Sequence, residues 1–232
     1  MDRRIVIGDI HGCYKTLKKL VDHQIKPEKT DQIYFVGDLI DRGPCSREVL
    51  DYIIDLKIKG FNVNAIKGNH EDLFVKAFSD EDYMRAWFHN GSEETLKSFD
   101  VPADKRNDFE GLKMVPERYI QFLSGLPYYY DLNDYIIVHA GLNITSEDHF
   151  ADIQAMLWSR EIKGLNFLKP GICIIHGHTP MPIVTLKPNL IRKDAQNLNI
   201  DAGCVYKDLP GYGVLAAIEL DSRKLFTQEN IE

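Results

Sequence analysis

The 232-residue sequence has few cysteines and no long apolar run, and each absence excludes a class of protein. Cys13, Cys45, Cys173 and Cys204 are widely scattered and form no Cys-x-x-Cys pair. This pattern favours four reduced thiols over a disulfide framework. The apolar run near the amino end stops at residue 8, and no other run reaches membrane-spanning length. We therefore expect a cytoplasmic protein with no membrane partner.

Basic residues do not outnumber acidic ones. The sequence has 28 Lys and Arg against 35 Asp and Glu, which gives a net charge of -7. This balance argues against a broad electrostatic grip on duplex nucleic acid but is compatible with a small phosphorylated substrate. The sequence also lacks internal repeats, low-complexity tracts and evident linkers. Residues 1–232 are therefore expected to form a single domain.

The first third of the chain alternates between strand and helix patterns. Strands are predicted at residues 5–7, 33–36 and 61–66. Helical spacing of apolar residues follows the first two strands, at residues 17–24 and 46–54, and Ser46 is predicted as the N-cap of the second helix. Three such units in series predict an α/β fold with a largely parallel sheet and helices on its faces.

The remainder of the chain begins with a stretch of different character. Residues 71 to about 125 are richer in charged and aromatic residues and are predicted to form a mainly helical insertion, broken near residues 101–102. Strands are predicted again at residues 128–131, 135–138 and 172–175. The last part of the chain, at residues 198–200, 214–220 and 224–227, suggests short antiparallel strands.

Five of the predicted strands lead directly into loops that carry potential metal ligands. The loops are residues 8–12 (GDIHG), 37–43 (GDLIDRG), 68–71 (GNHE), 139–141 (HAG) and 176–179 (HGHT). Carboxyl ends of strands in α/β sheets face one crevice, so we expect these loops to converge. Each motif alone is more typical of a turn or a structural histidine, but their coincidence indicates a metal centre. Asp, His and Asn suit Mn²⁺, Fe or Zn²⁺, and no loop offers a thiolate.

The ligands are too numerous for one ion, so the sequence predicts two divalent cations, with Mn²⁺ favoured over Fe and Zn²⁺. Such a pair clamps the attacking and leaving oxygens of an in-line displacement and activates a water. Arg42 is suited to bidentate binding of phosphate oxygens. His70 is suited to act as a general acid, with Asp41 as the carboxylate that orients it. Together these residues indicate hydrolysis of a phosphate ester.

The loops at residues 8–12, 37–43 and 68–71 resemble the three signature motifs of the phosphoprotein phosphatases, within the calcineurin-like metallophosphoesterases. The order is the same, and 24 residues separate each motif from the next (13–36 and 44–67). The later histidine loops resemble the remaining ligand motifs, so the resemblance covers about residues 5–205. It is closest to the bacterial and phage serine/threonine phosphatase branch, and it implies a β-sandwich flanked by helices.

The resemblance also implies roles for individual residues. It implies a first metal held by Asp9, His11 and His178, a second held by Asn69 and His139, and Asp38 as the bridging carboxylate. It implies that His70 is the acid, Asp41 its orienting partner, and Arg42 and Arg160 the phosphate-binding residues.

Other residues near the motifs have simpler interpretations. His176 points away from His178 by strand alternation, which favours a structural role. The pair at residues 90–91 (NG) resembles a segment near the active site in the bacterial branch, although a local turn explains it nearly as well. Residues 199–204 also resemble a bacterial segment, to which we assign no catalytic role.

Three functions are compatible with these motifs. They are a phosphatase for phosphoserine and phosphothreonine that also accepts phosphotyrosine, a symmetrical hydrolase of dinucleoside polyphosphates such as diadenosine tetraphosphate, and an inactive metal-binding scaffold. A scaffold needs neither Asp41, Arg42 nor His70. The resembling dinucleotide hydrolases tend to have another residue at position 41 and Asp at position 71, so Asp41 and Glu71 favour the phosphatase. We expect a phosphorylated protein or peptide substrate, with small phosphorylated molecules as further substrates.

Overall fold

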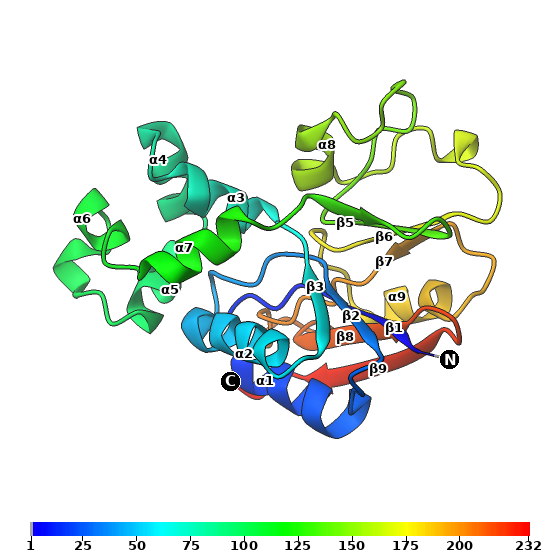
Figure 1. The fold of residues 1–232 in the computed structure, drawn as a ribbon, viewed down its shortest axis with the longest axis horizontal. Coiled ribbons are helices and arrows are strands. Elements are labelled where there is room, and N and C mark those ends of the chain that lie inside the picture. Colours follow the sequence, from blue (N-terminus) through cyan, green and yellow to red (C-terminus); the bar gives the residue numbers. More distant parts are fainter. Residues whose placement is uncertain (1) are drawn as a thin grey trace.

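The computed structural model describes residues 2–232 and contains two β-sheets that pack on each other, with helices on the outer faces (Figure 1). Sheet A has the strand order β3-β2-β1-β8-β9, and sheet B has the order β4-β5-β6-β7. Sheet A consists of β1 (Arg4–Ile7), β2 (Gln32–Phe35), β3 (Asn62–Ala65), β8 (Val214–Glu219) and β9 (Lys224–Glu229). Sheet B consists of β4 (Tyr129–Asp131), β5 (Tyr135–Val138), β6 (Cys173–His176) and β7 (Asn197–Asn199). The implied β-sandwich flanked by helices is confirmed.

The three central strands of sheet A, β2, β1 and β8, are apolar except for one polar end residue each, because both faces of the sheet are covered. Side chains alternate between the faces of a strand. Accordingly, Ile5 and Ile7 pack in the cluster formed with the outer helices, while Val6 packs between the sheets. In sheet B, Ile137 faces sheet A and Ile136 packs in the cluster on the outer face. The sandwich thus has three apolar layers, which fix the register of the strands.

Two helices cover sheet A next to its parallel strands. Helix α1 (Tyr14–Lys19) continues as a π-helical turn, η1 (Leu20–Ile25), and α2 (Ser46–Ile58) connects β2 with β3. Residues Val49, Leu50, Ile53 and Leu56 of α2 are buried, at the spacing of one helical face. The parallel pairing of β1, β2 and β3 confirms the predicted βα units.

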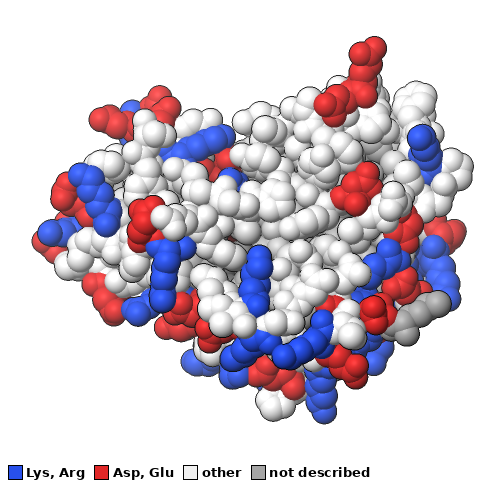
Figure 2. Space-filling view, in the orientation of Figure 1, with Lys and Arg blue, Asp and Glu red and all other residues white. Residues whose placement is uncertain are grey.

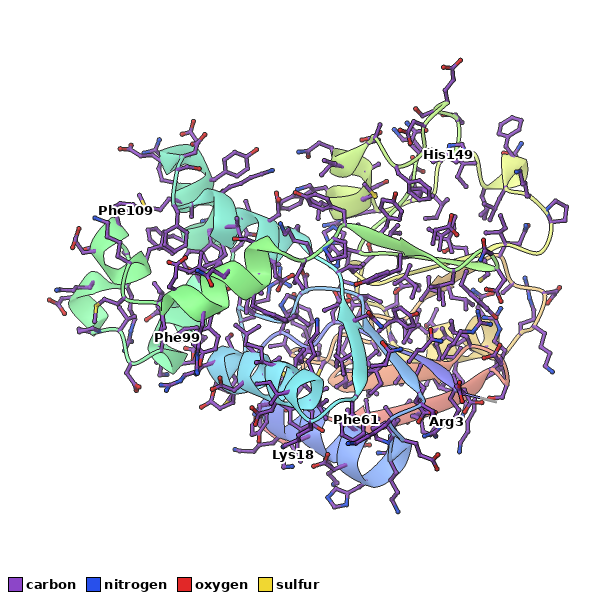
Figure 3. All side chains as sticks on the ribbon, in the orientation of Figure 1. Arg3, Lys18, Phe61, Phe99, Phe109 and His149 are labelled. Carbon is purple, nitrogen blue, oxygen red and sulfur yellow. The ribbon has the colours of Figure 1, made fainter. Side chains whose placement is uncertain are left out.

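The insertion that follows β3 is helical, as predicted (Figure 1, left). It contains α3 (Asn69–Lys76), α4 (Glu81–His89), α5 (Ser92–Ser98), the 3₁₀ turn η2 (Ala103–Lys105), α6 (Phe109–Leu112) and α7 (Glu117–Ser124). Figure 3 shows Phe99 and Phe109 on this side of the molecule and His149 on the far side, in the loop after β5. The break between α5 and η2 falls at residues 99–102, where it was predicted.

The other helices are short and lie with sheet B. They are α8 (Ile153–Trp158), the 3₁₀ turn η3 (Leu165–Phe167) and α9 (Ile183–Leu190). Met156 of α8 packs on the outer face of sheet B, and Leu186 of α9 joins the cluster between the sheets.

Two sequence-based expectations are wrong. The segment at residues 198–200 was expected to be antiparallel, but β7 pairs parallel with β6. The pairing is parallel because α9 forms a crossover connection between the two strands. Only β8 and β9 form the expected antiparallel hairpin. Ser46 is not an N-cap: it is the first residue of α2, and its Oγ accepts a hydrogen bond from the backbone N–H of Asp41 at 3.1 Å. The Ser46 hydroxyl therefore bonds to the loop that contains Asp41 and does not cap α2.

The surface charges and the state of the cysteines agree with the sequence analysis. Figure 2 shows acidic and basic side chains interspersed over the viewed face. None of the helices formed by residues 2–232 has the length and apolar composition needed to cross a membrane. All four cysteines are unpaired, as expected.

Candidate active site

The five ligand-bearing loops converge at the carboxyl ends of β1, β2, β3, β5 and β6. Their donor atoms form two groups in which all atoms lie within 4.8 Å of one another. One group is His11, Asp38 and His70, and the other is Asp38, His139 and His178. Asp38 belongs to both groups, as expected of a carboxylate that bridges two cations. β1, β2 and β3 belong to sheet A, whereas β5 and β6 belong to sheet B, so the site spans both sheets.

In the first group, Nδ1 of His11 is held by the backbone, and Nε2 faces the site, where it contacts Arg42 and Asp38. Nδ1 lies 2.9 Å from the carbonyl oxygen of Ile40, and Nε2 lies 3.4 Å from Oδ2 of Asp38. A metal-binding histidine typically donates its second ring N–H to a carbonyl or carboxylate. His11 and Asp38 both adopt left-handed backbone conformations, with φ of 45° and 48°. The sharp turns after β1 and β2 therefore aim both side chains at the same space.

The second group is built in the same way. Nδ1 of His139 lies 2.9 Å from the carbonyl oxygen of Val36, which leaves Nε2 directed at the site. Oδ1 of Asn69 lies 2.9 Å from Nε2 of His139 and 3.0 Å from Nδ1 of His178. Asn69, His139 and His178 thus join Asp38 around one point.

This arrangement corrects the division of ligands that the resemblance implied. His178 was expected beside Asp9 and His11, but its ring lies 3.1 Å from Nε2 of His139. What reaches Asp9 is the backbone N–H of His178, which donates to Oδ2 at 2.9 Å. With φ of 67° at His178, the chain presents the N–H to one group and the imidazole to the other.

Asp9 has a carboxylate oxygen that no group in the described part of the chain satisfies, as expected of a metal ligand. Its side chain is buried, and Oδ1 makes no hydrogen bond with any of residues 2–232. Burial, together with the nearby carboxylates of Asp201 and Asp38, raises the pKa of Asp9 well above its ordinary value. Burial likewise raises the pKa of Asp201 to about 7. Three buried carboxylates so close together can all be ionised only if positive charge compensates them.

The donor set therefore fits divalent cations. Carboxylate, imidazole and amide oxygen or nitrogen atoms suit Mn²⁺, Zn²⁺ or Fe, and the converging loops contribute no thiolate. Asp9, His11 and Asp38 would hold one cation, and Asp38, Asn69, His139 and His178 would hold the other. His70 lies close enough to the first group to be counted with it, but a different contact occupies its ring.

That contact is with Asp41. Nδ1 of His70 lies 2.7 Å from Oδ2 of Asp41, and both side chains are fully buried. Nε1 of Trp87 donates to the same carboxylate at 2.9 Å, and Oγ1 of Thr95 donates to its other oxygen at 2.6 Å. The other ring nitrogen of His70, Nε2, has no partner among residues 2–232. Burial opposes the charged ring, but the carboxylates of Asp38 and Asp41 raise the pKa of His70 above its ordinary value.

A cleft of about 370 Å³ opens over the two groups and contains both predicted phosphate-binding arginines, Arg42 and Arg160. Nη1 of Arg42 lies 2.6 Å from Nε2 of His11, at the edge of the first group. The backbone N–H of Arg42 donates to the carbonyl oxygen of Gly91 at 2.9 Å, so the turn between α4 and α5 positions Arg42. Trp158 and Tyr206 also line the cleft.

Several residues of the site were assigned no role from the sequence. Oε1 and Oε2 of Glu71 accept hydrogen bonds from the backbone N–H groups of Asp38, Leu39 and Gly68 at 2.8–2.9 Å, which ties the loops after β2 and β3 together. Trp87 and Thr95 hold Asp41 from the insertion. Glu71 is the last residue of a recognised motif and so had a local signal. For Trp87 and Thr95 the signal was the resemblance of residues 90–91, between them, to a segment near the active site, and it did not indicate a contact with Asp41.

Among residues that were expected to be structural, His176 is buried in sheet B. Its Nδ1 contacts the carbonyl oxygen of Gly177 at 3.0 Å, and burial lowers its pKa to about 4. A neutral structural histidine is consistent with its expected role.

Comparison with known proteins agrees with this geometry. A profile of the calcineurin-like phosphoesterases matches residues 3–206. The chain is 27% identical to a bis(5'-nucleosyl)-tetraphosphatase PrpE [asymmetrical] of Bacillus cereus, over 87% of this chain and 85% of that protein. Two solved structures share the fold. One, provisionally named a diadenosine tetraphosphatase, has a TM-score of 0.67 and 17% identity, over 100% of this chain and 95% of the other. A serine/threonine phosphatase of Saccharomyces cerevisiae has a TM-score of 0.64 and 18% identity, over 100% and 81%.

Proposed function

Because this chain belongs to the calcineurin-like phosphoesterase family, we propose that it is a metal-dependent phosphatase acting on phosphoserine and phosphothreonine in proteins or peptides. Family membership makes it a phosphoester hydrolase with a divalent metal centre. We base the choice of phosphoserine and phosphothreonine as substrates on the buried pair of His70 and Asp41, in which Nε2 of His70 is free.

The residues have separate tasks in this reaction. Arg42 and Arg160 bind the phosphoryl oxygens, and the planar guanidinium of Arg42 allows two parallel hydrogen bonds. Divalent cations held by Asp9, His11, Asp38, Asn69, His139 and His178 would supply Lewis acidity and make water at the site more acidic. His70 holds a proton on Nε2 and gives it to the leaving oxygen, while Asp41 accepts the Nδ1–H and fixes the ring.

The held proton matters most for an alkyl leaving group. The oxygen of a departing serine or threonine is strongly basic, so its departure requires protonation, whereas a nucleotide phosphate departs as a weak base. An acid whose ring is fixed by a carboxylate, which is itself fixed by Trp87 and Thr95, favours the phosphate monoester.

Hydrolysis of a bis(5'-nucleosyl) tetraphosphate is the second candidate function. The name of the Bacillus cereus relative favours it, although that name specifies asymmetrical cleavage and the sequence resemblance pointed to symmetrical cleavage. Trp158, a residue that is 39% exposed, lines the cleft together with Tyr206 and would provide a surface for a base.

One side-by-side assay separates the candidates. We would compare kcat/KM for a phosphoseryl peptide and for diadenosine tetraphosphate with Mn²⁺ present, and identify the nucleotide products. A higher kcat/KM for the peptide supports the proposal. A higher value for the dinucleotide would overturn it, and the products, two ADP or ATP with AMP, would then distinguish symmetrical from asymmetrical cleavage.

A further inference from the structure

A larger cavity lies at the other end of sheet B from the candidate active site. It has a volume of about 540 Å³ and is lined by the first residues of β5 and β6, by the loops at residues 166–172 and 193–196, and by Arg223 in the turn between β8 and β9. The carboxyl ends of β5 and β6 bear His139 and His178, whereas their amino ends line this cavity. The cavity is therefore separate from the metal-binding groups.

The side chain of Arg223 is unusual because its positive charge is buried without a matching carboxylate. Only 6% of Arg223 is exposed, and its Nη1 makes no hydrogen bond with residues 2–232. Its guanidinium lies over the ring of Tyr135, 5.3 Å from the ring centroid. Arg4 lies over the same ring at 5.2 Å, but it pairs with both Asp134 and Asp221. Arg223 has no such ion pair among the described residues.

The other charged residues of the cavity wall also leave positive charge without a partner. Asp134 receives two hydrogen bonds from Arg4, at 2.7 and 2.8 Å. Asp194 pairs with the Nε of Arg192 at 2.9 Å. Both acids of the wall thus already have an arginine partner, whereas Lys193 makes no ion pair within residues 2–232. The charges in the wall that lack a partner are both positive.

We propose that this cavity binds a small organic anion, with a carboxylate or phosphate group at Arg223 and an apolar part against Leu168, Pro170 and Ile172. A buried charge without a partner is costly, and an anion in contact with the guanidinium would compensate it. The charge is delocalised over the guanidinium, so compensation does not require contact with Nη1 itself. The side-chain amides of Asn166 and Gln196, which also line the wall, are further donors for the anion. The volume lies within the range of small-molecule sites.

The first test measures anion-dependent stabilisation of the metal-loaded protein. The probes are glutarate, a carboxylate, and methylphosphonate, a phosphate analogue without a hydrolysable ester bond. A ligand that binds only the folded state raises Tm in a concentration-dependent way. We expect at least one probe to raise Tm of the wild type, and the probe whose effect depends on Arg223 distinguishes the two sources of the anionic group.

Variants assign the effect to the cavity. Arg223→Gln should weaken the binding of that probe by about ten-fold or more, because it removes a charge-assisted contact. Without probe, Arg223→Gln should be at least as stable as the wild type, since it removes an unpaired buried charge. Lys187→Gln is the control: it removes one positive charge from an exposed side chain of α9 outside the cavity lining, and it should bind the probe like the wild type. Equal probe binding by the two variants would overturn the proposal.

A second measurement uses the wild type alone. Cys173 lines the cavity, whereas Cys45 lies near the amino end of α2 and serves as an internal reference. The probe should slow alkylation of Cys173 relative to Cys45, as read by mass spectrometry. Unchanged relative rates, together with an unchanged Tm, would show that the cavity binds neither class of anion.

Discussion

Nδ1 of His70 lies 2.7 Å from Oδ2 of Asp41, a carboxylate that Trp87 and Thr95 hold from the helical insertion. The insertion is therefore part of the candidate active site, because it supplies both groups that fix this carboxylate.

The first prediction concerns this pair. His70→Asn should lower kcat for a phosphoseryl peptide by about 10²–10⁴-fold, the usual contribution of a positioned acid or base. The loss should be much smaller for an aryl phosphate, whose leaving oxygen needs less protonation. Metal content measured by mass spectrometry should stay at the wild-type value. His23→Asn is the control, and equal losses on both substrates would contradict the role of His70 as an acid.

The second prediction concerns Glu71, which accepts hydrogen bonds from the N–H groups of Asp38, Leu39 and Gly68. Glu71→Gln replaces one acceptor oxygen with an NH₂ donor that faces another donor. We expect the free energy of unfolding to fall by about 1–3 kcal/mol, because buried N–H groups lose their partner. Chemical denaturation measures the change. Glu81→Gln, at a side chain that is 80% exposed, should change stability little, and similar losses in the two variants would disprove the anchoring role.

The third prediction concerns Gly91, whose φ is 97°. A Cβ at this position would lie 2.9 Å from Cγ of Arg42, so Gly91→Ala should displace Arg42, which we propose binds phosphate. We expect the inhibition constant for inorganic phosphate to rise by about ten-fold or more, since small misplacements at a site can cost up to ~10²-fold. Gly171→Ala is the matched control, because Gly171 has φ of 89° and a Cβ there would meet no atom within 4 Å. If both variants bind phosphate alike, Gly91 does not position Arg42.

The fourth prediction concerns acid stability and the ion pair between Arg3 and Asp31. Burial alone would raise the pKa of Asp31, but hydrogen bonds from Arg3 and from the N–H of Glu28 lower it below its ordinary value of 3.8. The folded state therefore favours the ionised carboxylate. Its stabilisation is complete above pH 3.8 and is lost as pH falls through the lower folded-state pKa.

Asp31→Asn tests this linkage by denaturation at several pH values. It should lower the free energy of unfolding by about 1.5–3 kcal/mol near pH 7, as expected for hydrogen bonds to a charged group. The difference from the wild type should shrink in acid. A difference that is constant across pH would show that the carboxylate charge contributes nothing.

The fifth prediction concerns the metal ligands. Chelation should abolish hydrolysis, and added Mn²⁺ should restore it. Chelation should also lower Tm, because cations bind the folded state and relieve repulsion among Asp9, Asp38 and Asp201. Full activity in a demetallated sample would disprove the metal centre.

The convergence of the five loops was predictable from the sequence for a physical reason. Parallel strands place their carboxyl ends at one edge, and the apolar runs before Asp9, Asp38 and Asn69 are clear. The helical insertion was also evident from composition. Its role in holding Asp41 was not, because Trp87 and Thr95 lie 46 and 54 residues further along the chain and their contact depends on how α4 and α5 pack.

The sequence could not predict which group of metal-binding side chains His178 joins, and the reason is a different one. Its residue type and its strand end were correctly identified, but the backbone conformation decides whether its ring or its N–H meets Asp9. The left-handed φ at His178 reverses the expected division. The N-cap prediction for Ser46 failed for a similar reason, because its hydroxyl accepts a hydrogen bond from Asp41 in the preceding loop rather than from an N–H of its own helix.

Asp38 extends from the end of β2 in sheet A, and His139 extends from the end of β5 in sheet B, where its ring also reaches the carbonyl oxygen of Val36. Cations held between these side chains would link sheet A to sheet B along one edge of the sandwich. The metal centre would then resist sliding of one sheet over the other, and its removal should speed amide exchange at the ends of β2 and β5 before the rest of either sheet is affected.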